Sequence, residues 1–89
     1  MKRAASDSEV IAVVAANVRA ARKAASLSQE ELAFEAQLDR TYISQVERKQ
    51  RNVTISVLAR IAKALGTTPD RLLIPIAGAS PSRPKKRRG

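Results

Sequence analysis

The chain has 89 residues, with 17 Lys and Arg against eight Asp and Glu, and it has no Cys and no His. That length allows one small domain with a modest core, and the missing Cys and His exclude disulfides, thiolate or imidazole metal sites and a His-based catalytic triad. No apolar run approaches the roughly 20 residues that span a bilayer. The formal net charge of +9 indicates an anionic partner, nucleic acid first and a membrane surface second.

The excess of basic residues is uneven along the chain. The last ten residues, SPSRPKKRRG, carry five positive charges and no acidic residue, which leaves twelve basic and eight acidic residues, or +4, on residues 1–79. We expect a flexible N-terminus at residues 1–5, one folded domain at residues 6–76 and a disordered basic tail at residues 77–89. The charges of the tail suit a non-specific DNA-tethering arm, and a vector-derived or processed end is the alternative.

The first part of the chain predicts a long helix over residues 6–25 rather than a signal peptide. Asp7 interrupts the apolar run that a signal peptide needs, and Ser6 with Glu9 has the spacing of a capping box. Apolar residues then recur every three or four positions and form an inward stripe: Val10, Ile11, Val14, Val18, Ala21 and Ala25.

The stretch SQEELAFEAQLDRTYISQVER, residues 28–48, predicts two short helices joined by a tight turn. Ser28 and Glu31 form a second capping box before a helix over residues 29–36, and Asp39 is placed to cap a helix over residues 40–48. On that helix Ile43 and Val46 can face inward together. Four side chains that can donate hydrogen bonds fall on the other side: Arg40, Thr41, Ser44 and Gln45.

A group of donors at the exposed start of a short helix suits the DNA major groove, which admits a helix and presents a code of donors and acceptors. The alternative is an ordinary helical hairpin with a solvated polar face. Neither Arg22 nor Glu47 has an evident role in reading bases. We expect these two to pair and to lock the first helix to the hairpin.

A fourth helix is predicted over residues 55–65, with Thr54 as its N-cap and Gly66 as the residue after its end. Its expected inward face consists of Ile55, Leu58, Ile61, Ala62 and Leu65.

A short fifth helix over residues 70–74 is expected after Pro69, and Pro75 stops it. It holds more apolar residues than so short a helix can bury against one core: Leu72, Leu73, Ile74 and, just beyond it, Ile76. These residues predict either a partner surface or a simple closure of the bundle.

The segment 14–73 resembles the five-helix DNA-binding domain of the Xre family, the Cro and C1-type phage repressor fold. The strings that carry the resemblance are SQEELA at 28–33, YIS at 42–44, ER at 47–48 and LARIAKALG at 58–66. LDRTYIS at 38–44, with ER and with RN at 51–52, is similar to controller proteins of restriction–modification systems. The resemblance implies an all-α, compact five-helix bundle of the lambda-repressor-like type, with the helix-turn-helix formed by helices 2 and 3.

The resemblance also implies roles for individual residues. It implies base contacts for Arg40, Thr41, Ser44 and Gln45, and a structural ion pair for Arg22 and Glu47. It implies phosphate or mixed contacts for Gln29, Tyr42, Arg48, Lys49, Arg51 and Asn52. Relatives often have Gly where this chain has Lys49 and Gln37, so the backbone there is left open. At Lys49 either the helix ends differently or a phosphate contact offsets the strain of a left-handed residue.

These features predict a cytoplasmic, sequence-specific transcriptional regulator that binds double-stranded DNA as a homodimer. One helix reads too few base pairs for specificity alone, and a two-fold dimer places two such helices about 34 Å apart on a palindrome. We expect dimer contacts at Leu72, Leu73 and Ile76 together with the fourth helix. We expect no cofactor, no metal, no membrane partner and no small-molecule ligand.

Three other functions are less favoured. An antitoxin-type protein, whose main partner is another protein, needs a binding segment, and only the first ten residues and the tail are spare. A binder of RNA or single strands needs more stacking aromatics than Phe34 and Tyr42. An enzyme is the least favoured, because the carboxylates spread along caps and a solvated face at Glu30, Glu31 and Glu35.

Overall fold

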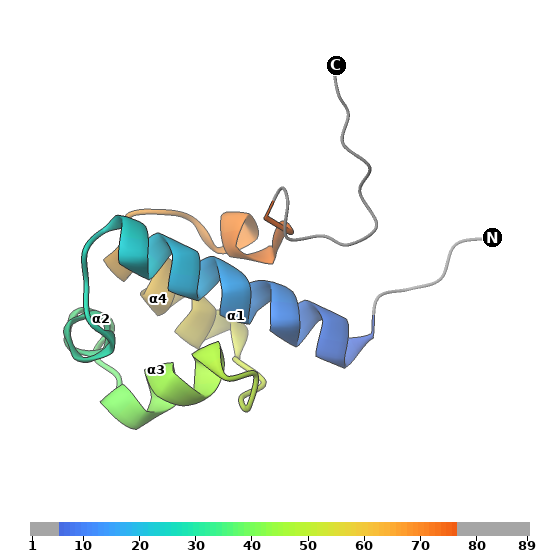
Figure 1. Ribbon diagram of the computed structural model, residues 1–89, viewed down its shortest axis with the longest axis horizontal. Helices are drawn as coiled ribbons and strands as arrows, with labels where there is room; N and C mark the ends of the chain where they lie inside the picture. Colours follow the sequence, from blue (N-terminus) through green and yellow to red (C-terminus); the bar gives the residue numbers. More distant parts are fainter. Residues whose placement is uncertain (1–5, 77–89) are drawn as a thin grey trace, which may run out of the picture.

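Four α-helices and one 3₁₀ helix follow one another in the computed structural model, which describes residues 6–76. They are α1 Asp7–Ala24, α2 Gln29–Ala36, α3 Arg40–Glu47, α4 Ile55–Leu65 and η1 Pro69–Leu73 (Figure 1). These described residues contain no strand, which confirms the predicted all-α class. The predicted flexible N-terminus (1–5) and basic tail (77–89) lie outside them.

Side-chain caps begin three of the four α-helices. The Ser6 hydroxyl accepts from the Glu9 amide at 3.2 Å while the Glu9 carboxylate accepts from the Ser6 amide at 2.8 Å. Ser28 and Glu31 repeat this capping box at 2.9 and 2.7 Å, and the Thr54 hydroxyl accepts from the Val57 amide at 3.2 Å. These caps satisfy backbone N–H groups that a first helical turn leaves without partners.

The four α-helices all end in the same pair of backbone hydrogen bonds, the Schellman motif. The longer-range bond of each pair joins Leu27 N to Arg22 O (3.0 Å), Leu38 N to Ala33 O (2.8 Å), Gln50 N to Gln45 O (2.8 Å) and Thr67 N to Ala62 O (2.9 Å). The residue that turns the chain has a left-handed backbone in each case: Ser26, Gln37, Lys49 and Gly66, with φ of 60°, 60°, 66° and 76°. Lys49 and Gln37 thus keep the conformation that relatives often give to Gly.

The predicted short fifth helix is present as the 3₁₀ helix η1, so the bundle has four α-helices rather than five. The hydrogen bonds of η1 span three residues, from Arg71 N to Thr68 O at 3.1 Å and from Ile74 N to Arg71 O at 3.5 Å. Pro69 lacks an N–H, and Pro75 disfavours the helical backbone at Ile74. Too few residues remain between the two prolines for a ladder of i→i−4 bonds, whereas a 3₁₀ helix suits such short pieces.

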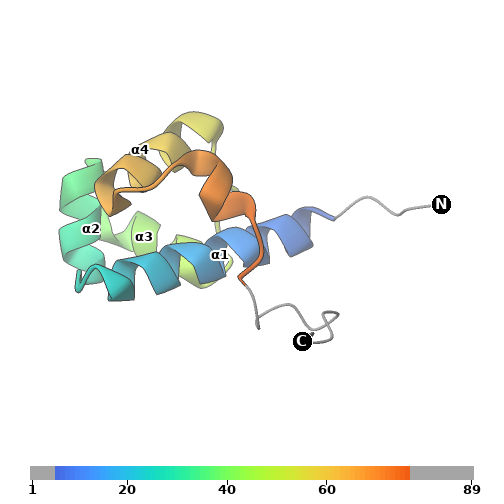
Figure 2. The same ribbon diagram turned by 90° about the horizontal axis from the view of Figure 1, so that it is seen from above.

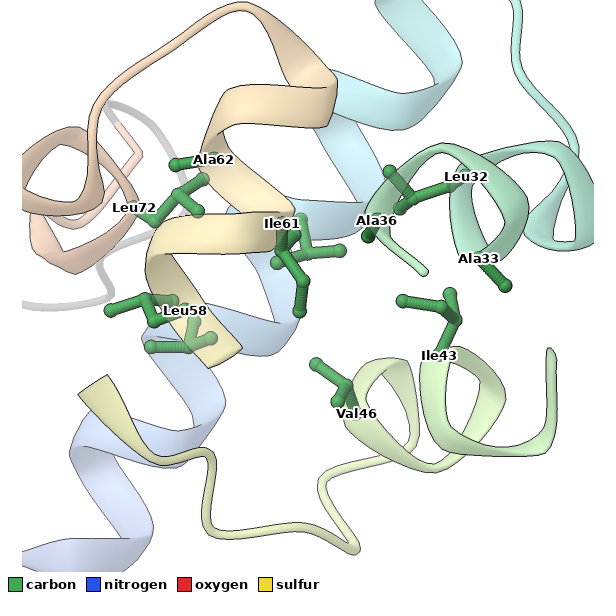
Figure 3. Packing of buried hydrophobic residues seen from close by; sticks show 11 residues of the cluster. Leu32, Ala33, Ala36, Ile43, Val46, Leu58, Ile61, Ala62 and Leu72 are labelled. Atoms are coloured by element: carbon green, nitrogen blue, oxygen red, sulfur yellow. The ribbon is translucent and has the colours of Figure 1, made fainter. Parts of the chain in front are cut away.

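The hydrophobic core lies between α1 and α4, with α2 across one end, α3 on one side of α1 and η1 on the other (Figures 1 and 2). In Figure 3 the side chains of Leu32, Ile43 and Ile61 point toward one another from α2, α3 and α4. Each of these three side chains is fully buried. Burial of such a side chain stabilises the fold by roughly 1.5–3 kcal/mol. The core therefore fixes how α2 and α3 sit on the rest of the bundle.

Ile55 was expected on the inward face of α4, and the structure leaves it 84% exposed. It opens the first turn of α4 beside a hollow that it lines together with Val10, Val53 and Leu73. The inward stripe of α4 begins one turn later, at the buried Leu58.

Candidate nucleic-acid interface

α2, the turn at residues 37–39 and α3 form the predicted helix-turn-helix. Ile43 and Val46 are buried against α2 and the core, so they hold one face of α3 inward (Figure 3). Asp39 has the extended backbone of an N-cap, although its carboxylate accepts no cap hydrogen bond from α3. The side chains predicted to read bases lie together on this helix, where Arg40 and Thr41 are exposed and Ser44 and Gln45 are half-buried.

The loop after α3 turns back over the helix. Lys49, in its left-handed conformation, reverses the chain, and Gln50 N is bonded to Gln45 O. The residues predicted to lie along the DNA backbone here are all exposed: Arg48, Lys49, Arg51 and Asn52. The loop thus places its basic side chains beside the polar face of α3.

Arg51 joins this loop to α3 by two contacts. Its guanidinium carbon lies 4.5 Å from the centroid of the Tyr42 ring, and its Nε donates to Gln45 Oε1 at 2.9 Å. Tyr42 and Gln45 are three residues apart, so they share one face of the helix and one guanidinium can reach both. Tyr42 is therefore a half-buried platform for Arg51 as well as a candidate DNA contact.

Glu47, the last residue of α3, is the buried centre of a hydrogen-bond network. Arg22 Nε donates to Glu47 Oε2 at 2.6 Å and Arg22 Nη2 donates to Glu47 Oε1 at 3.0 Å, which is the predicted ion pair. Gln29 Nε2 donates to Glu47 Oε1 at 3.1 Å, and Arg22 Nη1 donates to Leu27 O at 2.8 Å. The network joins α1, the start of α2 and the end of α3.

The same network sets the ionisation of Glu47. Burial opposes the charged form of this carboxyl, but the hydrogen bonds from Arg22 and Gln29 and the positive charge of Arg22 outweigh burial, so the pKa of Glu47 lies below its ordinary value. The hydrogen bond to Glu47 in turn raises the pKa of Arg22. Both side chains are therefore charged at neutral pH and act as a fixed tie.

The residues predicted for a dimer interface are not all on the surface. Leu72 is 2% exposed and belongs to the core cluster, so its expected place on a partner surface is wrong for the isolated chain. It is drawn inward because η1 closes the gap between α1 and α4. Leu73 is 46% exposed and Ile76 is half-buried. The hollow between α1, the α3–α4 loop and the start of α4 measures about 140 Å³ and is lined by Leu73 and Ile55.

Two structural residues went unnoticed in the sequence. Asn17 is buried on α1, and its Nδ2 donates to Leu72 O and Ile74 O, each at 2.8 Å. Its position within the apolar stripe, three residues after Val14, is a signal that a polar residue with a buried partner was needed there. Arg60 donates from Nε to Ala36 O at 3.1 Å and from Nη2 to Gln37 O, so it holds the end of α2. An exposed arginine beside the inward stripe of α4 carries no such signal.

The arrangement offers recognition rather than covalent chemistry. Hydrogen-bond donors and positive charges converge along α3 and the loop after it, a surface suited to an anionic, acceptor-rich partner. Within residues 6–76 no three Asp or Glu side chains come together as a metal site. No helix in the described part of the chain is both long and apolar enough to cross a membrane.

Comparison with known proteins places the chain among bacterial regulators. It is 54% identical over 61 residues to control protein C.SmaI of Serratia marcescens, a match that covers 68% of this chain and 73% of that one. It is similar to the structure of the hypothetical transcription factor NHTF from Neisseria, with a TM-score of 0.76, 40% identity, and 88% and 90% of the two chains covered. The match to the sequence of the Neisseria meningitidis hypothetical transcription factor covers 65% of that protein's length.

A third similar protein is the restriction–modification controller C.Esp1396I, whose structure is a tetramer in complex with its natural 35 base-pair operator. It has a TM-score of 0.66, 36% identity, and 71% and 83% of the two chains are covered. A helix-turn-helix family model matches residues 18–72, which include the whole of α2, α3 and α4. The chain therefore belongs to the helix-turn-helix family, as an Xre-type DNA-binding protein similar to restriction–modification controllers.

Proposed function

We propose that this protein is a sequence-specific transcriptional regulator that binds double-stranded DNA as a homodimer on a palindromic operator, in the manner of a restriction–modification controller. It acts sterically, by covering a promoter or sharing it with polymerase. The observation that carries the proposal is the donor-rich outer face of α3, which is held in place by the buried inner face of the helix and by Glu47 at its end.

The rigid attachment of α3 supports a role in reading bases. Ile43 and Val46 fix its inner face, and Glu47 ties its last turn to α1 and α2 through Arg22. A helix that is fixed in this way can present side chains to the major groove without losing much conformational entropy on binding. Its first turn, with the exposed Arg40 and Thr41, is the part that a helix-turn-helix directs at base edges.

Individual roles follow from the chemistry of each side chain. Arg40 is placed to make a bidentate contact with guanine, worth roughly 1–3 kcal/mol of discrimination, and the methyl of Thr41 is placed to contact a thymine methyl. One N–H of the Gln29 side-chain amide donates to Glu47, and its second N–H is proposed to donate to a DNA phosphate at the start of α2. Phosphate contacts from the loop fix the register of the protein on DNA: Arg48, Lys49, Arg51 and Asn52.

The dimer is proposed on the opposite part of the surface from the turn of the motif. The exposed apolar side chains of Ile55 and Leu73 line the hollow at the start of α4, and Ile74, the residue after Leu73, is exposed as well. A second copy of the chain would cover these apolar atoms. The operator-bound tetramer of C.Esp1396I shows that a similar protein does assemble on DNA, which supports an oligomeric form here.

The test is selection from a randomised duplex pool at about physiological ionic strength, followed by sequencing. The wild type should enrich a palindrome with half-sites about 34 Å apart, and Arg40→Ala should relax the preference at one position in each half-site. Lys63→Ala, which removes an exposed positive charge from α4, is the control and should enrich the wild-type sequence. Binding that enriches no sequence and vanishes as salt rises would refute sequence-specific reading.

The dimer is tested with Leu73→Glu, at a position exposed enough to accept the change in a folded monomer. Sedimentation should give a dimer for the wild type and a monomer for the variant, and the variant should lose affinity for the palindrome but not its fold. A wild type that sediments as a monomer both free and on DNA would refute the homodimer.

A further inference from the structure

We propose that Arg51, from the loop after α3, sets what Gln45 can read. Arg51 holds the amide oxygen of Gln45, so that Gln45 meets a base pair as a hydrogen-bond donor. The preferred base edge is that of guanine, which offers two acceptors in the major groove, O6 and N7. This inference rests on the proposed function, that α3 reads duplex DNA.

The hydrogen bond itself fixes the orientation of the amide. Arg51 Nε lies 2.9 Å from the Gln45 side chain, and a guanidinium has only donors. The atom of the amide that faces it must therefore be the oxygen, whichever way the amide could otherwise turn. The NH₂ group of Gln45 is on the other branch of the planar amide and remains for a base.

Two features keep Arg51 in this position. The Tyr42 ring lies under the guanidinium, 4.5 Å from ring centroid to guanidinium carbon, and attracts its positive charge by a cation–π interaction. The left-handed Lys49 and the bond from Gln50 N to Gln45 O at 2.8 Å bring the loop back over α3. Arg51 is thus a positioning residue for Gln45, built from the loop and the helix together.

The consequence for base reading follows from the pattern of donors and acceptors. A glutamine reads adenine with two bonds, giving one from its NH₂ to N7 and accepting one from N6 at its oxygen. Here the guanidinium of Arg51 already donates to the amide oxygen of Gln45, and its positive charge repels a second donor. Gln45 and Arg51 then form one continuous surface of N–H groups, which favours the two acceptors of guanine over adenine and rejects the N4 donor of cytosine.

The experiment compares base preferences selected from a randomised duplex pool by the wild type and matched variants. Gln45→Ala first identifies the base pair that Gln45 reads, as the position whose preference is lost. The wild type should select a G·C pair over an A·T pair there. Arg51→Ala frees the amide oxygen and should lower the preference for guanine over adenine at that same position by roughly tenfold.

Two arginine variants separate positioning from charge. Arg48→Ala removes an exposed positive charge from the same loop and should weaken binding to all sequences alike, with an unchanged base preference. Arg51→Lys keeps the charge but loses the planar guanidinium and its stacking on Tyr42. It should therefore lower the preference for guanine over adenine as Arg51→Ala does, while keeping the salt dependence of the wild type. Thermal unfolding checks that each variant is folded.

Several outcomes would overturn the inference while leaving the proposed function intact. One is a wild type that selects an A·T pair at the position of Gln45; another is a Gln45→Ala variant with every preference unchanged. A third is Arg51→Ala behaving like Arg48→Ala, which would make Arg51 a phosphate contact alone. A wild type that enriches no sequence at all would overturn the proposed function and this inference together.

Discussion

Arg22 on α1 and Glu47 at the end of α3 form a two-pronged salt bridge across 25 residues of sequence, with N–O distances of 2.6 and 3.0 Å. The Glu47 side chain is 1% exposed, so its charge has left water almost completely. Gln29 adds a third hydrogen bond from the start of α2. One buried carboxylate therefore sets the position of α3 relative to α1 and α2.

Glu47→Gln should destabilise the fold by about 3 kcal/mol, because it leaves the half-buried guanidinium of Arg22 without its counter-charge. Arg22→Met should cost a similar amount for the reverse reason. The double variant Arg22→Met/Glu47→Gln should recover part of the loss, since no uncompensated buried charge remains. Urea unfolding of the four proteins measures this cycle, and simple additivity of the two single losses would contradict a direct pair.

The pH dependence of stability should carry the signature of Glu47. Its pKa in the folded chain is below the ordinary value of 4.5, so at acid pH the unfolded chain binds more protons than the folded one. The stabilisation is therefore complete above about pH 5 and is lost as pH falls through 4.5 toward the folded-state pKa. Urea unfolding should show a smaller loss across this interval for Glu47→Gln than for the wild type. Parallel curves for the two would assign the acid sensitivity to other carboxyls.

The α-helices and their order were predictable because their signals are local. The two capping boxes, the Thr54 cap and Gly66 act within a few residues of the helix ends that they fix. The polar outer face of α3 was predictable for the same reason, since Ile43 and Val46 define its inward side. Which side chains of the outer face contact DNA is still a prediction.

Features that depend on packing across the chain could not be predicted in this way. Whether Leu72 faces outward or inward depends on η1 closing over α1 and α4, more than 50 residues from the start of α1. The bond between Arg51 and Gln45 depends on how a left-handed Lys49 aims the loop. Hydrophobic periodicity describes one helix at a time, whereas each of these contacts joins two elements of the fold.

Asn17→Ala should destabilise the fold by about 2–3 kcal/mol, because the carbonyls of Leu72 and Ile74 lose their donor while Leu72 stays buried. Amide hydrogen exchange should rise most in residues 69–76, where the chain is tied to α1 by this side chain. Asn52→Ala, at an exposed asparagine, is the control for urea unfolding and should change stability by less than about 0.5 kcal/mol. Equal effects of the two variants would show that the buried amide contributes little.

Gln37→Gly should stabilise the fold by about 0.5–1 kcal/mol. Gln37 has a φ of 60°, where a Cβ costs roughly 1–2 kcal/mol, and the greater freedom of Gly in the unfolded chain cancels part of the gain. Gln37→Ala keeps the Cβ and should give no such gain, which makes it the control. A Gly variant less stable than the wild type in urea unfolding would mean that the Gln37 side chain contributes more than its backbone strain costs.

Lys49→Gly should separate stability from DNA binding. The φ of 66° at Lys49 predicts a gain in folding stability similar to that at Gln37. Loss of the ammonium should reduce affinity for every DNA sequence and lower the slope of log K against log salt by about 1, if Lys49 contacts one phosphate. Lys49→Gln keeps the strained backbone and removes the charge, so it should lose the affinity without gaining the stability. Urea unfolding and salt-dependent binding measure the two effects, and an unchanged salt slope in both variants would remove Lys49 from the proposed phosphate contacts.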